Sequence, residues 1–289
     1  MMEHPYASLQ GGRWLVGNLH AHTTASDGQR DHQAVIDDYA GRGHGFLMIS
    51  DHDILTDADD YADLDPHGMI LIPGNEITAQ GPHMLHVGAS GLVEPHADRQ
   101  RVIDDVGTNG GFVIFNHPNW QARFSHCPQD LMDQCQGYMG LEIYNGVISR
   151  LDGSPYATNR WDLLLSAGRR VWGFANDDSH AAVGDVGLGW NVVYVEDETP
   201  QGVVDALARG RFYASTGVEI SRIEVNGRRI VLETENASRI VALRDTGRRL
   251  ATVDGRCMEF EVPDGVRYVR FECWGDGEAF AWTQPFFAA

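Results

Sequence analysis

The stretch Gly17–Gly28, "GNLHAHTTASDG", places His20 and His22 one residue apart behind an apolar run, and Asp27 follows them. Residues i and i+2 of a strand point the same way, so both histidines would face one point, whereas a helix would separate them. The sequence "SDG" around Asp27 is also an ordinary turn. With 13 histidines in 289 residues, such a pair arises by chance often enough that other motifs must decide between a metal site and a coincidence.

Outward from this stretch, short apolar runs alternate with helical patterns up to about residue 215. The predicted strands, rich in residues that suit burial on both faces, are 13–22, 45–53, 68–78, 83–89, 111–118, 140–146, 169–180 and 189–196. Helical patterns occupy 31–43, 98–111 and 199–212, and the last has Thr199 as a potential N-cap before Pro200. This alternation predicts an α/β fold with a parallel sheet or barrel.

The pattern changes after about Gly217. Apolar and polar residues then alternate, and Asn-Gly, Asp-Gly and Thr-Gly pairs interrupt them, which is typical of short antiparallel strands. We therefore predict two domains, residues 1–217 and a small all-β domain at 218–289. No set of residues in the second domain converges on chemistry, so we expect it to serve packing or interaction.

The composition limits the partners. A net charge of −19 disfavours non-specific binding to nucleic acids and anionic membranes, although bound metal ions would still allow a small anionic substrate. No apolar run approaches the roughly 20 residues that span a bilayer, and the start does not resemble a signal peptide. The four cysteines form no C-x-x-C pair, as expected for thiols in a reducing compartment. We expect a soluble, cytoplasmic protein.

Nearly every predicted strand of the first domain ends in a histidine or an acid, and in α/β barrels catalytic groups collect at the carboxyl ends of the strands. The candidate metal ligands are His20, His22, Asp27, His52, Glu76, His83, His117, Asp178 and His180. Nitrogen and oxygen donors without thiolates suit Zn²⁺, Mn²⁺ or Fe²⁺. So many ligands exceed the needs of one ion, so we expect about two or three divalent ions, with Glu76 as the bridging carboxylate.

The other histidines are interpreted separately. His83 and His86 lie three residues apart on one predicted strand and face opposite ways, so only one of them is expected to be a ligand. The remaining histidines fall in loops or helices and are predicted to be surface residues: His4, His32, His44, His67, His96 and His126.

The motifs "HAHTTASDG", "SDHD", "GNEIT", "GPHMLHVG", "NHP" and "DDSH", in this order across residues 14–217, resemble the polymerase-and-histidinol-phosphatase (PHP) superfamily of metallohydrolases. The segments "ALARGRFYASTG" and "AWTQPFF" are similar to its branch with carbaryl-hydrolase-like members. The resemblance implies a distorted seven-stranded (β/α) barrel with a metal cluster at its C-terminal mouth, followed by a small β tail.

The resemblance also implies a ligand set. One ion would be held by His20, His22, Glu76 and Asp178, a second by Glu76, His83 and His117, and a third, where the family has one, by Asp27, His52 and His180. His83 is favoured because it stands five residues before Gly88, as in the related pattern Gly-His-x-x-x-x-Gly. Pro82 departs from that pattern and keeps His86 open.

The activity implied is that of a metal-dependent phosphoesterase, which hydrolyses a small phosphorylated metabolite with a metal-bridging hydroxide. Asp178 or His180 would shuttle a proton. Arg123, Asn145 and Arg150 are candidates for contacting the phosphate, with ordinary surface or turn roles equally open. Two alternatives remain: a metal-dependent hydrolase of a carbamate, carboxylic ester or amide, and a non-catalytic metal-binding PHP module. No ligand position is vacant, which argues against the module.

Overall fold

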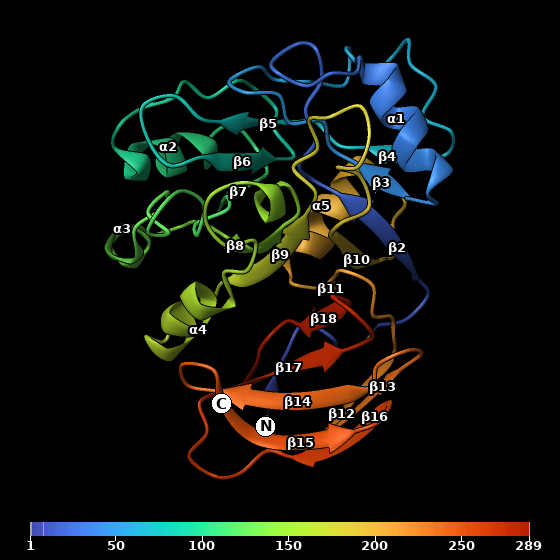
Figure 1. The fold of residues 1–289 in the computed structure, drawn as a ribbon, viewed down its shortest axis with the longest axis vertical. Helices are drawn as coiled ribbons and strands as arrows, with labels where there is room; N and C mark the ends of the chain where they lie inside the picture. The colour runs from blue at the N-terminus through green and yellow to red at the C-terminus, as the bar shows by residue number, and fades with distance from the viewer. Residues whose placement is uncertain (1, 8, 289) are drawn as a thin grey trace.

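The computed structural model describes residues 2–7 and 9–288 and is a mixed α/β protein (Figure 1). Its helices are α1 (His32–Gly41), α2 (Arg99–Val106), α3 (Gln129–Gln134), α4 (Thr158–Ser166), α5 (Pro200–Ala208) and the 3-10 helix η1 (Val147–Arg150). The three predicted helices are confirmed as α1, α2 and α5. Thr199 caps α5 through a hydrogen bond from the Gly202 N–H, as its sequence indicates.

The strands of the described residues form three sheets. The largest runs in the order β1 (Met2–Glu3), β19 (Phe286–Ala288), β17 (Tyr268–Trp274), β18 (Phe280–Thr283), β11 (Phe212–Ser215), β10 (Trp190–Val195), β2 (Arg13–Asn18), β3 (Phe46–Leu47) and β4 (Ile70–Leu71), with β14 (Arg239–Arg244) on β17 and β15 (Arg248–Asp254) on β14. The second runs β5 (Gly74–Ile77), β6 (Met84–Val87), β7 (Phe112–Phe115), β8 (Gly140–Asn145) and β9 (Trp172–Asn176), and the third runs β12 (Ile220–Asn226), β13 (Arg229–Thr234) and β16 (Cys257–Glu261).

The expectation of a parallel sheet is correct only in part. Strands β2, β3 and β4 are parallel, as are β7, β8 and β9, but β6 is antiparallel to both β5 and β7, and β10 is antiparallel to both β2 and β11. The physical reason at β5–β6 is chain length, because the connection at 78–83 is too short for the crossover that parallel strands require.

The predicted distorted seven-stranded barrel is not confirmed. The ladders of the described residues belong to separate sheets, and isolated bridges join segments around the candidate site. One bridge joins Ala21, after β2, to Ser179, after β9, and another joins His52, after β3, to Glu76 within β5. These bridges bring the segments that carry the histidine motifs side by side.

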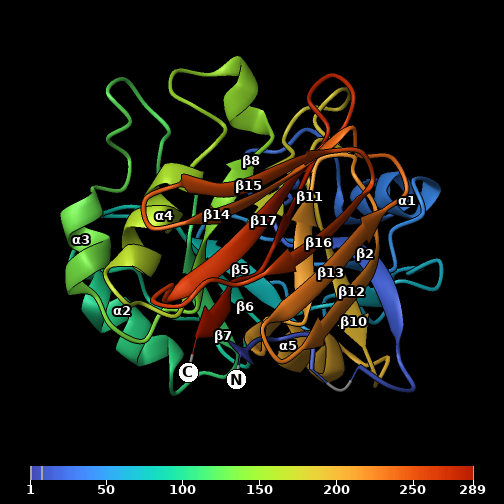
Figure 2. The same cartoon turned by 90° about the horizontal axis from the view of Figure 1, so that it is seen from below.

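The C-terminal strands are antiparallel, as the alternating pattern indicates, and they lie below the α/β part in Figure 1. They are not a separate layer, because β11 pairs with β18 and carries the largest sheet across residue 217. Figure 2 shows the two chain ends close together, where β1 pairs with β19. The domain division at residues 217 and 218 stays a prediction.

A buried ion pair joins the C-terminal strands to the α/β part of the chain. Arg270 on β17 donates to both carboxylate oxygens of Asp162 on α4, at 2.8 and 2.7 Å, and stacks over Trp161. Deeper in the α/β part, Phe46, Val193 and Leu207 belong to an apolar cluster between the β2–β3–β10 strands and α5. No helix in the described part of the chain has the length and apolar character needed to cross a membrane.

Candidate metal centre

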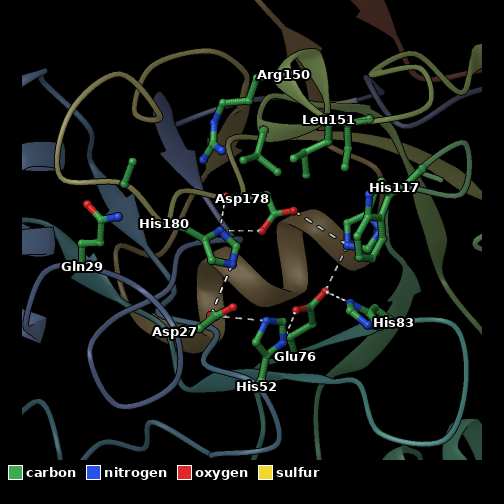
Figure 3. Close-up of a pocket in the computed structure, with 14 residues that line it drawn as sticks. Asp27, Gln29, His52, Glu76, His83, His117, Arg150, Leu151, Asp178 and His180 are labelled. Carbon is green, nitrogen blue, oxygen red and sulfur yellow. Dashed lines mark hydrogen bonds and ion pairs between the residues drawn. The ribbon is translucent and has the colours of Figure 1, made fainter.

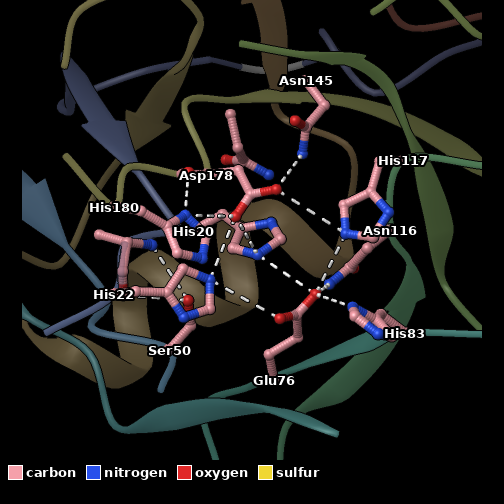
Figure 4. A network of polar contacts seen from close by, with 12 residues as sticks. His20, His22, Ser50, Glu76, His83, Asn116, His117, Asn145, Asp178 and His180 are labelled. Atoms are coloured by element: carbon pink, nitrogen blue, oxygen red, sulfur yellow. Dashed lines mark hydrogen bonds and ion pairs between the residues drawn. The ribbon is translucent and has the colours of Figure 1, made fainter. Parts of the chain in front are cut away.

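The structure brings all nine predicted ligands together at one site, which Figures 3 and 4 show in two close-ups with different residues drawn. Most come from the carboxyl end of a strand or from the segment that follows it, whereas His83 directly precedes β6, which is antiparallel to its neighbours β5 and β7. His20 and His22 follow β2, Glu76 lies on β5, and His117 follows β7. Asp27, His52, His83, Asp178 and His180 complete the cluster. Strand-end placement was therefore the informative signal in the sequence.

Local hydrogen bonds explain why the chain beyond β2 is held so firmly. The Ala21 N–H donates to Ser50 Oγ at 3.0 Å, and the His22 N–H donates to the Ser179 carbonyl at 2.9 Å. The segment is thus fixed between the ends of β3 and β9. His20 and His22 are completely buried there and lie with ring centroids 5.1 Å apart.

The ligand atoms gather in overlapping groups whose members lie within 4.8 Å of one another. The groups are His22–Asp27–His52–His180, His20–His117–Asp178, His20–His22–Glu76, His52–Glu76–His83 and His83–His117–His126. Glu76 belongs to two groups, and its Oε1 lies 3.2 Å from His20 Nε2 and 3.3 Å from His117 Nε2. Its central place is the one expected of a bridging carboxylate.

Unpartnered polar atoms test whether these residues fit metal ions. Among the described side chains, His20 Nε2, both ring nitrogens of His22, His52 Nδ1 and Glu76 Oε2 are buried and make no hydrogen bond of good geometry, although His52 Nδ1 lies 2.8 Å from Glu76 Oε2. Burying a polar atom without a partner is costly. Imidazole nitrogens and carboxylate oxygens are also the donors that Zn²⁺, Mn²⁺ and Fe²⁺ accept. The residues therefore fit a cluster of divalent ions.

Two residues of the site have strained backbones. His117 has a φ of 26° and Asp178 a φ of 59°, although neither is glycine. Such conformations cost about 1–3 kcal/mol each and persist only where the surroundings impose them. Asp178 is held by hydrogen bonds to the His20 carbonyl from its own N–H and from the Ser179 N–H, at 2.9 and 3.4 Å. The strain turns both side chains toward the cluster (Figure 4).

Glu142 on β8 is a functional candidate that the sequence analysis missed. It is 1% exposed. Its carboxylate lies 2.8 Å from each of four donors: His20 Nδ1, the His117 N–H, and the side-chain amides of Asn145 and Asn176. With Nδ1–H donating to Glu142, His20 presents the Nε2 lone pair to the cluster. An acid within the apolar strand "GLEIYNG" was the signal that could have revealed it.

The charges within the cluster shift the pKa values of its carboxyl and imidazole groups. Burial disfavours ionised Glu76 and Asp178, but the neighbouring histidines outweigh it and hold the pKa of both carboxyls below the ordinary range. Burial likewise opposes protonation of His20 and His52, but the carboxylates around them prevail. They raise the pKa of His20 well above its ordinary value and that of His52 to about 9. The metal-free cluster thus attracts positive charge.

The structure separates His83 from His86. His83 Nδ1 lies 3.2 Å from Glu76 Oε1, within the cluster. His86 is completely buried elsewhere, with Nε2 2.9 Å from the Gly110 carbonyl. Of the two alternatives, His83 is the one at the site.

The prediction of surface positions is wrong for two histidines. His126 and His44 are each only 8% exposed, because the loops that carry them fold inward. His126 Nε2 accepts a hydrogen bond from the His83 N–H at 3.0 Å, and burial together with the neighbouring His117 and His83 lowers its pKa to about 2. His126 therefore extends the cluster beyond the predicted set.

A pocket of about 360 Å³ opens over the cluster. Arg150 lines it but forms an ion pair with Asp185, with Nη2 2.6 Å from Oδ2. Asn145 is buried below it and donates to Asp178 Oδ2 at 3.2 Å and to Glu142. Arg123 lies on an exposed turn and does not line the pocket. The assignment of Arg123, Asn145 and Arg150 to phosphate binding stays a prediction.

A solved structure of similar fold covers the whole length of this chain. A two-domain protein from Bacteroides vulgatus that contains a predicted PHP-like metal-dependent phosphoesterase aligns over 100% of this chain and 90% of its own, with 18% identity and a TM-score of 0.57. The chain has a PHP-like fold. The resemblance of its motifs to that superfamily is thus confirmed at the level of the fold, whereas the carbaryl-hydrolase-like branch is not confirmed.

Two further solved structures are more distantly similar. A candidate metal-dependent phosphoesterase from Bifidobacterium adolescentis aligns over 67% of this chain and 96% of its own, with 18% identity and a TM-score of 0.47. An amidohydrolase from Chromobacterium violaceum, with bound sulfate and no metal, aligns over 57% and 87%, with 16% identity and a TM-score of 0.42. No protein-family model and no curated protein sequence matches this PHP-like chain.

Proposed function

We propose that this PHP-like protein is a metal-dependent phosphoesterase that hydrolyses a small phosphorylated molecule. The observation that carries the proposal is the convergence of nine histidine and carboxylate side chains, several with buried atoms that lack a hydrogen bond. All of them except His20 and His22 line a pocket large enough for a metabolite. The PHP-like fold supports the same reading.

The residues suited to hold the ions are the nine predicted ligands: His20, His22, Asp27, His52, Glu76, His83, His117, Asp178 and His180. Bound Zn²⁺, Mn²⁺ or Fe²⁺, about two or three per chain, would supply Lewis-acid activation of water and neutralise phosphoryl charge. The number and the identity of the metal ions are both part of this proposal.

The chain itself supplies proton transfer and exclusion of water. His180 lines the pocket, with Nδ1 2.8 Å from the Asp178 carbonyl and Nε2 3.3 Å from Asp27 Oδ1. With Nδ1–H held by that carbonyl, the Nε2 lone pair of His180 faces Asp27 and the pocket, where it would bind a third ion or, if that site holds none, take a proton at the substrate. Trp120 and Ile148 line the same pocket and shield its floor from water.

The test is a parallel assay of the protein loaded with each metal in turn. The substrates are phosphate monoesters and, for the alternative activity, aryl carboxylic esters and carbamates. We expect phosphate release by the wild type and its loss in the double variant His20→Ala, His22→Ala. Hydrolysis of aryl esters alone would overturn the phosphoesterase proposal. Unchanged phosphate release in a double variant that has lost its metal would show that this cluster is not the active site.

A further inference from the structure

The pocket above the cluster has two chemically different sides. Metal-ligand side chains form what we call its floor, and the apolar lining residues Trp120, Val147, Ile148 and Leu151 form what we call its outer wall. Figure 3 shows Leu151 across the pocket from Glu76. Val147 and Ile148 are buried in η1, but Leu151 remains 44% exposed at the mouth. A phosphoryl group on the floor would therefore place its alcohol against apolar side chains.

The outer wall offers no free cation to a second anionic group. Among the described residues that line the pocket, Arg150 is the only arginine or lysine. Its Nε and Nη2 donate to the two carboxylate oxygens of Asp185 at 3.1 and 2.6 Å. Asp185 is 3% exposed and also accepts from the N–H groups of His180 and Ala181, so this pair is built into the loop. The pair offsets the charge of Arg150 and uses the bidentate Nε and Nη2 edge of its guanidinium, although the side chain is 50% exposed.

The rest of the rim adds no cation. Gln29, which also lines the pocket, is neutral. A substrate carboxylate or second phosphate outside the metal floor would lose part of its hydration without gaining a charged partner.

Trp120 gives the apolar wall a fixed shape. Its ring packs against His117 and His126 with centroids 5.2 and 4.8 Å apart. Its backbone is tied to the neighbouring loop by the bridge to Gly153. A rigid aromatic side chain presents contact area at little entropic cost, and it suits a planar or apolar group.

We propose that the site selects a phosphomonoester whose alcohol is apolar or aromatic and carries no second anionic group. This inference rests on the proposed phosphoesterase function. It makes Leu151 and Trp120 specificity-determining residues and leaves Arg150 paired with Asp185 rather than bound to substrate.

The experiment compares benzyl phosphate with 4-carboxybenzyl phosphate, whose leaving groups are both benzylic alcohols but differ by one carboxylate charge, and with glycerol 1-phosphate, which has a polar alcohol. We expect kcat/KM for benzyl phosphate to exceed both others by about tenfold or more, the range over which apolar pockets discriminate. Leu151→Asp should reduce the preference over glycerol 1-phosphate. The control Val183→Asp adds the same charge to an 89% exposed apolar position outside the pocket and should leave the preference unchanged.

Binding of the non-hydrolysable benzylphosphonate and 4-carboxybenzylphosphonate, measured by calorimetry on the metal-loaded protein, separates the two proposals. Preferential binding of benzylphosphonate without turnover of any phosphate ester would refute the phosphoesterase function and retain the selectivity. Turnover with equal or greater kcat/KM for 4-carboxybenzyl phosphate or glycerol 1-phosphate would overturn the selectivity and retain the phosphoesterase.

Discussion

Replacing Glu142 by Gln should weaken metal binding although Glu142 is not among the predicted ligands. Its Oε1 lies 2.8 Å from His20 Nδ1 and Asn176 Nδ2, and its Oε2 lies 2.8 Å from the His117 N–H and Asn145 Nδ2. A glutamine amide must turn its NH₂ toward one of these donor pairs. Two hydrogen bonds are then lost and buried donors left unpaired, at about 1–3 kcal/mol each.

The less costly orientation places the new NH₂ beside His20, because the backbone N–H of His117 cannot become an acceptor. His20 Nδ1 would then accept, and its proton would move to Nε2, the atom that faces Glu76 and Asp178 at 3.2 and 3.1 Å. A protonated Nε2 cannot bind a metal ion. Loss of such a supporting carboxylate typically lowers metal affinity 10- to 100-fold, equivalent to about 1.4–2.8 kcal/mol.

The assay is competition with a chromophoric chelator, with thermal unfolding of the metal-free protein measured alongside. Glu272→Gln is a matched control, because Glu272 also accepts side-chain N–H bonds on both of its oxygens, from Trp274, Trp282 and Arg270, in the C-terminal strands. It should leave metal affinity unchanged. Wild-type affinity in a folded Glu142→Gln protein would refute the role assigned to Glu142.

Three further predictions concern stability. Arg270→Met leaves the Asp162 carboxylate buried and unpaired, so denaturant unfolding should show a loss of about 3–5 kcal/mol, and a loss below about 1 kcal/mol would contradict the pair's role. Burial lowers the pKa of His44 from 6.5 to about 4. The unfolded state therefore binds the proton first, and the free energy of unfolding should fall by about 3 kcal/mol between pH 7 and 4. In His44→Phe the free energy of unfolding should depend less on pH over this range. The same dependence in the variant and the wild type would refute the role assigned to His44. Gly111→Ala places a Cβ 1.8 Å from the Val87 carbonyl at a φ of +63°, so it should lower the melting temperature, and an unchanged value would contradict this clash.

Helices α1, α2 and α5 and most strands follow from the sequence because local signals specify them, whereas α3, α4 and η1 were not predicted. The Thr199 cap and the apolar periodicity of 199–212 are sufficient for α5. Strand direction is not encoded locally. The apolar pattern of residues 83–89 is the same for a parallel and for an antiparallel β6. Only the short connection at 78–83 indicates that β6 runs antiparallel to β5. Closure of a barrel likewise depends on pairing between distant segments, which the apolar pattern does not specify.

The candidate ligands were predictable because nearly all of them end strands whose carboxyl ends meet. Glu142 and His126 were missed for different reasons. Glu142 lies inside a strand, where its partners come from three other segments. His126 lies in a loop whose inward fold depends on contacts such as that with Trp120, and no periodic pattern marks such a loop as buried.

The central claim is that the cluster around Glu76 binds metal ions. Elemental analysis of the purified protein, before and after reconstitution with Zn²⁺, Mn²⁺ and Fe²⁺, tests it most directly. We predict about two to three ions per chain, with near-complete loss in the double variant His20→Ala, His22→Ala. Less than one ion per chain after reconstitution with each metal, or an unchanged count in the folded double variant, would contradict the account.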